Sequence, residues 1–303
     1  MFIQKPQQIS EHVHFVGSIV ACNFVVEAPK PALIDAGFTF SAPTLQKDVT
    51  RILGSPQKLT YLFLTHSHYD HIGCVSFFKR LHPGLVVAGH PRLQRIFDNP
   101  KAMGLIRALN KQAERLAPLP EAFRDQTIIG SLALDHPIAD GERFDLGAGV
   151  TLQALHSPGH TRDCIWYYLL PDRVLFGGDG LGVYTGDGSV MAEFTSSFDN
   201  LMASLRRVQE LDIDVLALPH SGVVVGKNDV QAHLQKTLAE NQRYHDRIVA
   251  GLQKHKGSIP AVVEEMTREE YETRGIYQPE EAFRLNLEAM VRAVIREQEN
   301  QKE

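Results

Sequence analysis

The chain has 303 residues, of which 43% are hydrophobic, so it can form one large domain or two smaller domains with a sizeable core. The formal net charge is −5 at pH 7 and the isoelectric point is near 6.3, so no basic surface for nucleic acid is expected. Neither an apolar stretch of about 18 residues nor a signal-peptide core is present, so no membrane span and no membrane partner are expected.

The first third of the chain alternates short strands with one helix. Helical spacing predicts a helix over Ser41–Leu53, with Ser41 as its N-cap. Apolar runs bounded by turn residues predict strands at His12–Val16, Asn23–Glu27, Ala32–Asp35 and Leu59–Leu64.

A cluster of metal-ligand residues follows the last of these strands. The segment Thr65-His66-Ser67-His68-Tyr69-Asp70-His71 holds three imidazoles and one carboxylate. Neutral imidazole and carboxylate groups are accepted as ligands by Zn, Fe and Mn. A strand that ends in such a cluster directs several ligand groups to one place, so the segment predicts a metal site.

The next segment contains a predicted helical insertion. A helix is predicted over Ile72–Leu81 and a strand over Gly84–Ala88. A helical insertion is then predicted at about residues 91–126, with helices at Pro91–Phe97 and Lys101–Leu116. The insertion is expected either to form part of a lid over the site or to be a surface helical hairpin.

Three further strand-like segments end in a single ligand-type residue. Val150–Leu155 leads to His160, Arg173–Phe176 leads to Asp179, and Asp214–Leu218 leads to His220. Strand ends that deliver ligands to one sheet edge are typical of a site built on loops over a rigid scaffold. We therefore expect these side chains to complete the metal site.

The chain becomes helical after Asn228. Long helices are predicted at Val230–Lys254 and Glu280–Gln298, and a shorter helix begins at Ser258 with Pro260 in its first turn. The expected organisation is a domain at 1–227 that carries the metal site and a C-terminal helical region at 228–303. The cysteines Cys22, Cys74 and Cys164 form no disulfide pattern, which favours a reducing cytoplasm.

This pattern resembles the metallo-β-lactamase superfamily in its two-metal hydrolase form. The resemblance implies an α/β fold, a four-layer αββα sandwich, here with a C-terminal helical extension. It also implies that Asp35, at the end of an early strand, hydrogen-bonds a ligand imidazole and fixes its tautomer. The ligand sets that it implies are His66, His68 and His160 for one ion, Asp70, His71 and His220 for the other, and a bridging Asp179.

Within the superfamily, the chain looks most like the acyl-CoA thioesterase type of the alkylquinolone signal pathway. The segments Leu109–Gln112 and Asp179–Gly182 carry this closer resemblance, together with the cluster at 65–71. Resemblance to glyoxalase II is more distant. The resemblance to such relatives implies that the helical region at 228–303 covers the active site.

The expected function is hydrolysis of a thioester, acyl-CoA-like or related, through a metal-bridging hydroxide, with Asp70 orienting the nucleophile or shuttling its proton. The cofactors would be two divalent metal ions, with zinc expected first and iron or manganese as alternatives. Alternatives for the function are a lactonase, a diiron oxidoreductase, and a signalling protein that acts through a partner. The expected partners are a small-molecule ester or thioester and, through the helical parts, a second copy of the chain in a homodimer.

Overall fold

A computed structural model describes residues 1–276 and 278–300. The chain forms two compact units and enters each of them more than once. The first unit comprises Met1–His156, Asp163–Gly178 and Ile213–Lys227, and the second comprises Ser157–Arg162, Asp179–Asp212 and Asn228–Glu303. The predicted boundary between 227 and 228 stays a prediction, and residues 277 and 301–303 of its C-terminal region lie outside the described residues.

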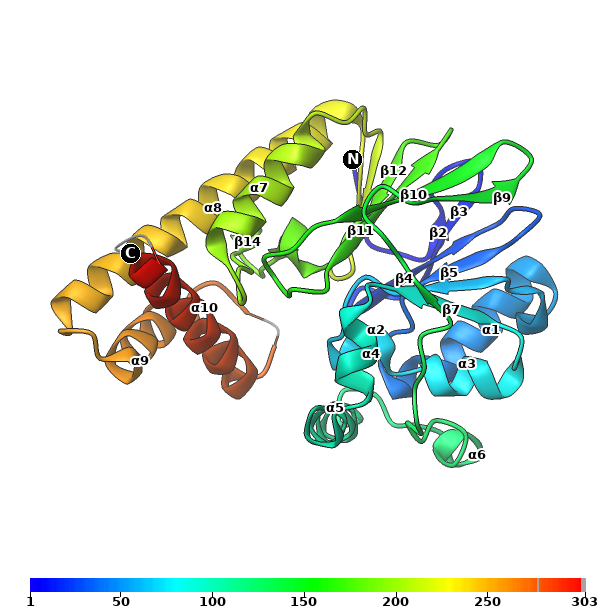
Figure 1. The fold of residues 1–303 in the computed structure, drawn as a ribbon, viewed down its shortest axis with the longest axis horizontal. Helices are drawn as coiled ribbons and strands as arrows, with labels where there is room; N and C mark the ends of the chain where they lie inside the picture. The colour runs from blue at the N-terminus through cyan, green and yellow to red at the C-terminus, as the bar shows by residue number, and fades with distance from the viewer. Residues whose placement is uncertain (277, 301–303) are drawn as a thin grey trace. The chain divides into compact units, whose positions relative to one another are not determined.

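Two seven-stranded sheets form the centre of the first unit (Figure 1). In the first sheet only β12 and β15 pair in parallel, and the other neighbours are antiparallel. The strand order of this sheet is β1 (Phe2–Ile3), β16 (Val223–Val225), β15 (Val215–Ala217), β12 (Val174–Phe176), β11 (Ile165–Leu170), β10 (Val150–His156) and β9 (Arg143–Gly147).

The strands of the second sheet lie side by side in chain order. Its first half is antiparallel, whereas the strands from β5 to β8 pair in parallel. The strands are β2 (Gln7–Gln8), β3 (Val13–Ser18), β4 (Ala21–Val26), β5 (Ala32–Ile34), β6 (Tyr61–Phe63), β7 (Val86–Gly89) and β8 (His136–Pro137).

The strand β4 shows how the sequence builds the core. All of its residues are buried, and alternate side chains face opposite sides of the sheet. Cys22, Phe24 and Val26 belong to one hydrophobic cluster with residues of the first sheet, such as Phe176. Val25 faces the other way, into a cluster with residues of the helices. The second sheet is therefore covered on both faces.

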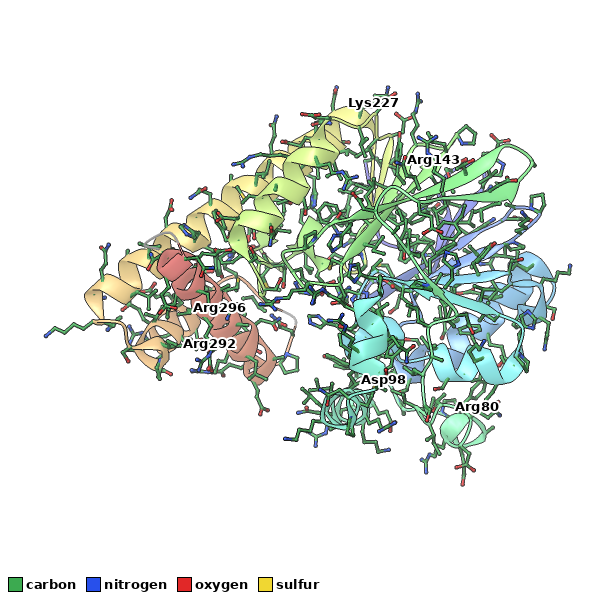
Figure 2. The ribbon with its side chains drawn as sticks, viewed as in Figure 1. Arg80, Asp98, Arg143, Lys227, Arg292 and Arg296 are labelled. Atoms are coloured by element: carbon green, nitrogen blue, oxygen red, sulfur yellow. The ribbon has the colours of Figure 1, made fainter. Side chains whose placement is uncertain are left out.

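Helices cover the second sheet on the face opposite the first sheet. They are α1 (Ala42–Leu53), α2 (Tyr69–Ile72), α3 (Val75–Leu81), α4 (Arg92–Phe97), α5 (Pro100–Ala113) and α6 (Glu121–Arg124), with short 3₁₀ turns η1 (Thr39–Ser41) and η2 (Pro56–Lys58). Leu45 and Val49 of α1 enter this cluster. Arg80 of α3 donates to the backbone carbonyls of Gln126 and Ile128, which ties the loop after α6 to α3 (Figure 2).

The second unit is mainly helical. Its elements are η3 (Asp179–Leu181), the hairpin β13 (Val183–Tyr184) and β14 (Val190–Met191), α7 (Phe198–Gln209), α8 (Lys227–Lys254), α9 (Ile259–Glu270) and α10 (Glu280–Asn300). The Oγ of Ser197 caps α7 at the backbone N–H of Asn200 and also donates to Glu297 of α10, at 2.6 Å. This contact joins the start of α7 to the last turns of α10.

Most of the predicted elements are confirmed within a few residues, and the differences concern helix ends. The predicted helix at Ile72–Leu81 is interrupted at Gly73 and Cys74 between α2 and α3. Ser41 and Ser258 occupy the N-cap positions of α1 and α9, but their side chains make no capping hydrogen bond. The helix α7 was not expected from the sequence. No helix among the described residues has the length and apolar character required to cross a bilayer.

Candidate metal centre

The loop that carries the first histidines begins where β6 ends. The strands β5 and β6 are parallel, with Ile34 opposite Phe63, so their carboxyl ends meet at one sheet edge. Asp35 follows β5, and the segment 65–71 follows β6. Parallel pairing therefore brings an early carboxylate to the histidine loop, although some 30 residues separate them.

Asp35 is the centre of a buried hydrogen-bond network. Its Oδ1 accepts from the backbone N–H of Thr65 at 2.8 Å, and its Oδ2 accepts from the Thr65 hydroxyl at 2.7 Å. The same Oδ2 lies 2.8 Å from Nδ1 of His71. A carboxylate that accepts from Nδ1 keeps the proton there and leaves Nε2 as the ligand atom. The predicted contact of Asp35 with an imidazole of the histidine loop is present, while the role of His71 as a metal ligand stays a prediction.

Backbone hydrogen bonds lock the turn after Asp35 against the end of the histidine loop. Ala36 N donates to His71 O at 2.7 Å, and Gly73 N donates to Gly37 O at 2.7 Å. A Cβ at Gly73 would lie 2.5 Å from Gly37 O, so this close approach requires glycine. The interruption between α2 and α3 therefore has a physical reason, because the chain must pass this turn at van der Waals contact.

Cys74, three residues after His71, is a buried small residue. Its thiol donates to the carbonyl oxygen of Phe38 at 2.8 Å. Burial raises the pKa of the Cys74 thiol, so the thiolate that a metal would require is disfavoured.

Asp70, His71 and His220 form one group of ligand atoms within the first unit. These atoms lie within 4.8 Å of one another. Asp70 Oδ2 is 3.4 Å from Nε2 of His220, and Asp70 Oδ1 is 4.0 Å from Nε2 of His71. Nδ1 of His220 lies 2.5 Å from the carbonyl oxygen of Val20, so both imidazoles have Nδ1 at an acceptor and Nε2 toward the carboxylate.

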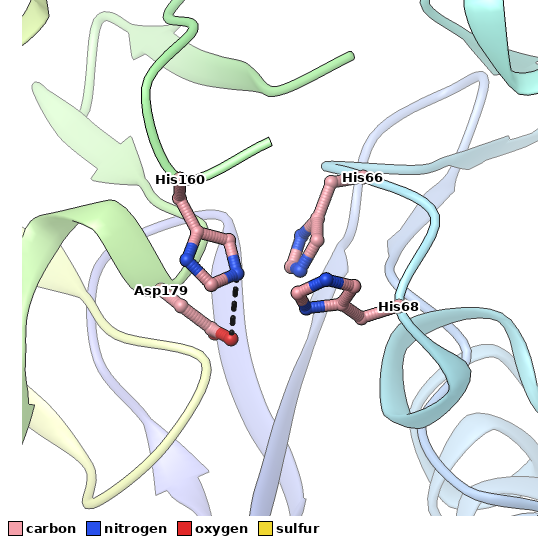
Figure 3. Close-up of side chains that lie close together, drawn as sticks. All are labelled: His66, His68, His160 and Asp179. Atoms are coloured by element: carbon pink, nitrogen blue, oxygen red, sulfur yellow. Dashed lines mark ion pairs between the residues drawn. The ribbon is translucent and has the colours of Figure 1, made fainter. Parts of the chain in front are cut away.

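His66 and His68 lie on the same loop of the first unit (Figure 3). His66 is buried, and its ring centroid is 4.6 Å from that of His68 and 4.0 Å from that of His71. Nδ1 of His66 lies 3.0 Å from the hydroxyl oxygen of Thr65. The loop thus brings His66, His68 and His71 together, as their spacing predicts.

His160 and Asp179 form an ion pair within the second unit, marked in Figure 3. Asp179 Oδ2 is 3.3 Å from Nε2 of His160. Nδ1 of His160 faces Glu193, at 2.9 Å from its carbonyl oxygen and 3.4 Å from its carboxylate. The arrangement repeats that of His71, with Nδ1 held at an acceptor and Nε2 toward a predicted ligand carboxylate.

Glu193 is a residue that sequence reasoning missed. It stands in no motif, and its only signal is a carboxylate in the apolar run Val190–Phe194. Its side chain is buried, and its backbone N–H donates to Asn241 of α8 at 3.1 Å. Burial lowers the pKa of the His160 imidazole, but contacts with Asp179 and Glu193 raise it more, so the net pKa is well above its ordinary value.

The chemistry of the donor set fits divalent cations. In each unit, Nδ1 of an imidazole lies at a hydrogen-bond acceptor, and Nε2 of the same ring lies near a carboxylate oxygen. Oriented imidazole nitrogens with one or two carboxylates match the preferences of Zn and of Fe or Mn. The assignment of His66, His68, Asp70, His71, His160, Asp179 and His220 to individual ions stays a prediction.

Comparison with protein families gives one match that covers most of the ligand-bearing chain. The model of the metallo-β-lactamase superfamily matches residues 17–220. An atrochrysone carboxyl ACP thioesterase of Aspergillus fumigatus is 28% identical over 205 residues, which are 68% of this chain but 38% of that relative. A metallo-β-lactamase fold-containing protein of Sulfurisphaera tokodaii is 30% identical over 195 residues, 61% of this chain and 69% of that protein.

Solved structures agree on the fold over nearly the whole chain. A metallo-β-lactamase family protein of Thermus thermophilus covers 98% of this chain and 93% of its own, with a TM-score of 0.65 and 20% identity. A subclass B3 metallo-β-lactamase of Bradyrhizobium japonicum covers 82% of this chain and 96% of its own, with a TM-score of 0.59 and 18% identity. The predicted α/β class, αββα with a C-terminal helical extension, is confirmed. The chain belongs to the metallo-β-lactamase superfamily.

Proposed function

We propose that this protein is a dinuclear metal-dependent hydrolase that cleaves a thioester, acyl-CoA-like or related. The observation that carries the proposal is the ligand group of Asp70, His71 and His220, in which both imidazoles have Nδ1 at an acceptor. Several curated relatives, at 24% to 28% identity, are named atrochrysone carboxyl ACP thioesterases, which supports a thioester as the substrate class.

The predicted ligands would hold two metal ions. His66, His68 and His160 would hold one ion, Asp70, His71 and His220 the other, and Asp179 would join both. Two divalent cations would supply a water of lowered pKa and would polarise a carbonyl oxygen. The Asp35 carboxylate and the Glu193 carbonyl oxygen accept from Nδ1 of His71 and His160, which keeps Nε2 available.

Asp70 is proposed to act on the proton of the attacking water. Its carboxylate lies between the imidazoles of His71 and His220, and its side chain is 13% exposed. One oxygen can accept the proton while the other stays with the ligand set. A thioester suits this chemistry because a thiolate leaves with little assistance.

Zinc is the proposed metal, with iron or manganese as alternatives, because the donor types suit all three. A cytoplasmic location is also proposed, supported by the three buried cysteines Cys22, Cys74 and Cys164, whose scattered positions form no disulfide pattern. We further propose a helical region after residue 227 that covers the active site and a homodimer through the helical parts.

The decisive experiment measures hydrolysis by protein of known metal content. The panel contains octanoyl-CoA, benzoyl-CoA, lactoylglutathione and an acyl-homoserine lactone. The proposal requires turnover of a thioester with about two metal ions per chain, and it requires that His68→Ala and Asp179→Ala lose metal and nearly all turnover. A matched control is His14→Ala, which removes a β3 histidine that pairs with Glu27 at 2.9 Å.

The same panel separates the alternatives. Preference for the lactone would replace the thioesterase by a lactonase, and full activity in metal-free protein would refute the mechanism. Full metal occupancy without any turnover would favour a regulatory role through a partner. Reduction of O₂ or NO without hydrolysis would indicate the oxidoreductase branch of the fold.

A further inference from the structure

The outer face of α5 is a continuous exposed strip. Its exposed residues are mostly three or four positions apart in the chain, which places their side chains on one side of the helix. Leu105, at 60% exposure, lies on this strip, and Leu116, at 58%, lies in the turn just beyond the helix. We define the α5 face as the exposed residues Lys101, Gly104, Leu105, Ala108, Lys111 and Gln112 of α5, together with Arg115 in the turn just beyond it.

The α5 face is positively charged on a protein that is acidic overall. Lys101, Lys111 and Arg115 lie on it, and it carries no acidic residue, whereas the whole chain has a net charge of −5. Glu114 flanks the face and pairs with Lys111 at 2.6 Å, but the Lys111 side chain is 78% exposed, so water screens this pair. The side chains of Ala108, Lys111, Gln112, Glu114 and Arg115 line an open, shallow depression of the surface.

The helix α5 is fastened to the loop that carries the predicted ligands. Asn110 is 2% exposed, and its Nδ2 donates to the carbonyl oxygen of Tyr69 at 2.8 Å. Its Oδ1 accepts from the backbone N–H of Thr39 at 2.9 Å. Tyr69 stands between His68 and Asp70, so the α5 face lies about one helix diameter, roughly 10 Å, from the ligand loop.

We propose that the α5 face docks an acidic, helical acyl carrier protein that presents the thioester on its phosphopantetheine arm. This inference rests on the proposed thioesterase function and names its partner. Cations interleaved with exposed apolar side chains are typical of a surface that binds a protein of opposite charge. The 14 residues of α5 form a strip about 20 Å long, which suits a helix of a partner better than a single nucleotide.

The test compares one acyl group on two supports. Rates are measured with octanoyl carrier protein and with octanoyl-N-acetylcysteamine, a thioester without a carrier. In the double variant Lys111→Glu/Arg115→Glu, the ratio of kcat/KM for the carrier to that for the small thioester should fall about tenfold or more. Binding of fluorescently labelled holo carrier protein, followed by anisotropy, should weaken equally and should lose most of its salt dependence.

The helix α1 offers a matched control. Lys47 and Arg51 have the same spacing as Lys111 and Arg115, and one member of each pair contacts a carboxylate three residues away. The variant Lys47→Glu/Arg51→Glu makes the same change of charge on an exposed helix of the same unit (Figure 1). It should leave both the ratio and the carrier affinity at the wild-type values.

Each other outcome has a definite meaning. An unchanged ratio and unchanged carrier affinity in the α5 variant would overturn the docking surface, whatever the absolute rates. An equal loss with octanoyl-CoA would overturn the carrier protein as the occupant and assign the cations to the CoA phosphates. Wild-type protein that cleaves neither octanoyl thioester nor any thioester of the panel above would refute the proposed function, while the anisotropy measurement would still decide whether the α5 face binds the carrier.

Discussion

Asp35 governs the state of two histidines at once. It accepts directly from Nδ1 of His71, and it also accepts the hydroxyl proton of Thr65. With that proton directed at Asp35, the Thr65 oxygen is an acceptor for Nδ1 of His66, at 3.0 Å. One carboxylate therefore keeps Nε2 of both imidazoles available as a ligand atom.

The variant Asp35→Asn should weaken metal binding by about 10- to 100-fold, because an amide cannot accept both protons. The dissociation constant is measured by competition with a chromophoric chelator. Asp48→Asn removes a carboxylate on α1 that accepts from Gly17 N at 3.2 Å, and it serves as the control. Wild-type affinity in Asp35→Asn would contradict the role assigned to Asp35.

His233 should make the stability of the second unit depend on pH. Burial lowers the pKa of His233 to about 4, although its hydrogen bond to the Leu181 carbonyl oxygen opposes the shift. Because the unfolded state binds this proton more readily, stability is complete above about pH 6.5 and falls by about 3 kcal/mol toward pH 4.

Urea unfolding at pH 7.5 and pH 4.5 measures this loss in wild type and in His233→Gln. Glutamine retains a donor for Leu181 O and an acceptor for the hydroxyl of Tyr184, which lies 2.9 Å from Nδ1 of His233. The pH dependence should shrink in this variant but not in His14→Gln. An equal pH dependence in wild type and His233→Gln would show that the His233 proton does not limit stability.

At the scale of elements, Arg274 fastens the hairpin β13–β14 to the turn after α9. Its guanidinium donates to the Val190 carbonyl oxygen at 2.9 Å and to Ser189 Oγ at 2.5 Å. It also pairs with the buried carboxylate of Glu270 at 2.9 Å. The hairpin lies between Asp179 and Glu193 in the chain, so this fastening steadies the segment that carries both carboxylates.

The variant Arg274→Ala should lower the free energy of unfolding by about 3 to 5 kcal/mol, because it leaves part of a buried charge uncompensated. Arg292→Ala is the control, since Arg292 is 55% exposed and pairs only along α10 with Glu288 (Figure 2). It should cost about 0.5 kcal/mol or less. Similar losses in the two variants, measured by urea unfolding, would refute the structural importance of the Arg274 network.

At the scale of the whole molecule, the predicted ligands are divided between the two units. His66, His68, Asp70, His71 and His220 belong to the first unit, and His160 and Asp179 belong to the second. The proposed cations would contribute binding free energy to the folded state.

Metal removal should lower the thermal stability. A free metal concentration of about 100 times Kd adds about 2.7 kcal/mol to the folded state, and a chelator removes this contribution. Calorimetry with and without chelator measures the shift in Tm. In Asp179→Ala the chelator should have little further effect, and an unchanged Tm in wild type would contradict metal binding by this set.

The local sequence pattern was sufficient to predict the histidine loop, the strand before it and the long helices α8 and α10. The loop residues His66 to His71 are neighbours in the chain, so their proximity needs no knowledge of the fold. The apolar run before them predicts a buried strand, and the helical spacing after residue 227 predicts helices. The two can be told apart because strand and helix periods differ. Resemblance to the superfamily then supplied the more distant predicted ligands His160, Asp179 and His220.

Other features depend on contacts between segments that are distant in the chain. Glu193 meets His160 across 33 residues, and Asn110 meets Tyr69 across 41. The sequence places Gly73 within a predicted helix, and only the structure shows that the turn at Gly37 packs against it and requires glycine there. The sequence by itself determined which residue types could bind metal and which segments would be helix or strand. Only the tertiary structure decided which buried carboxylate holds which imidazole, because that choice depends on sheet pairing and helix packing.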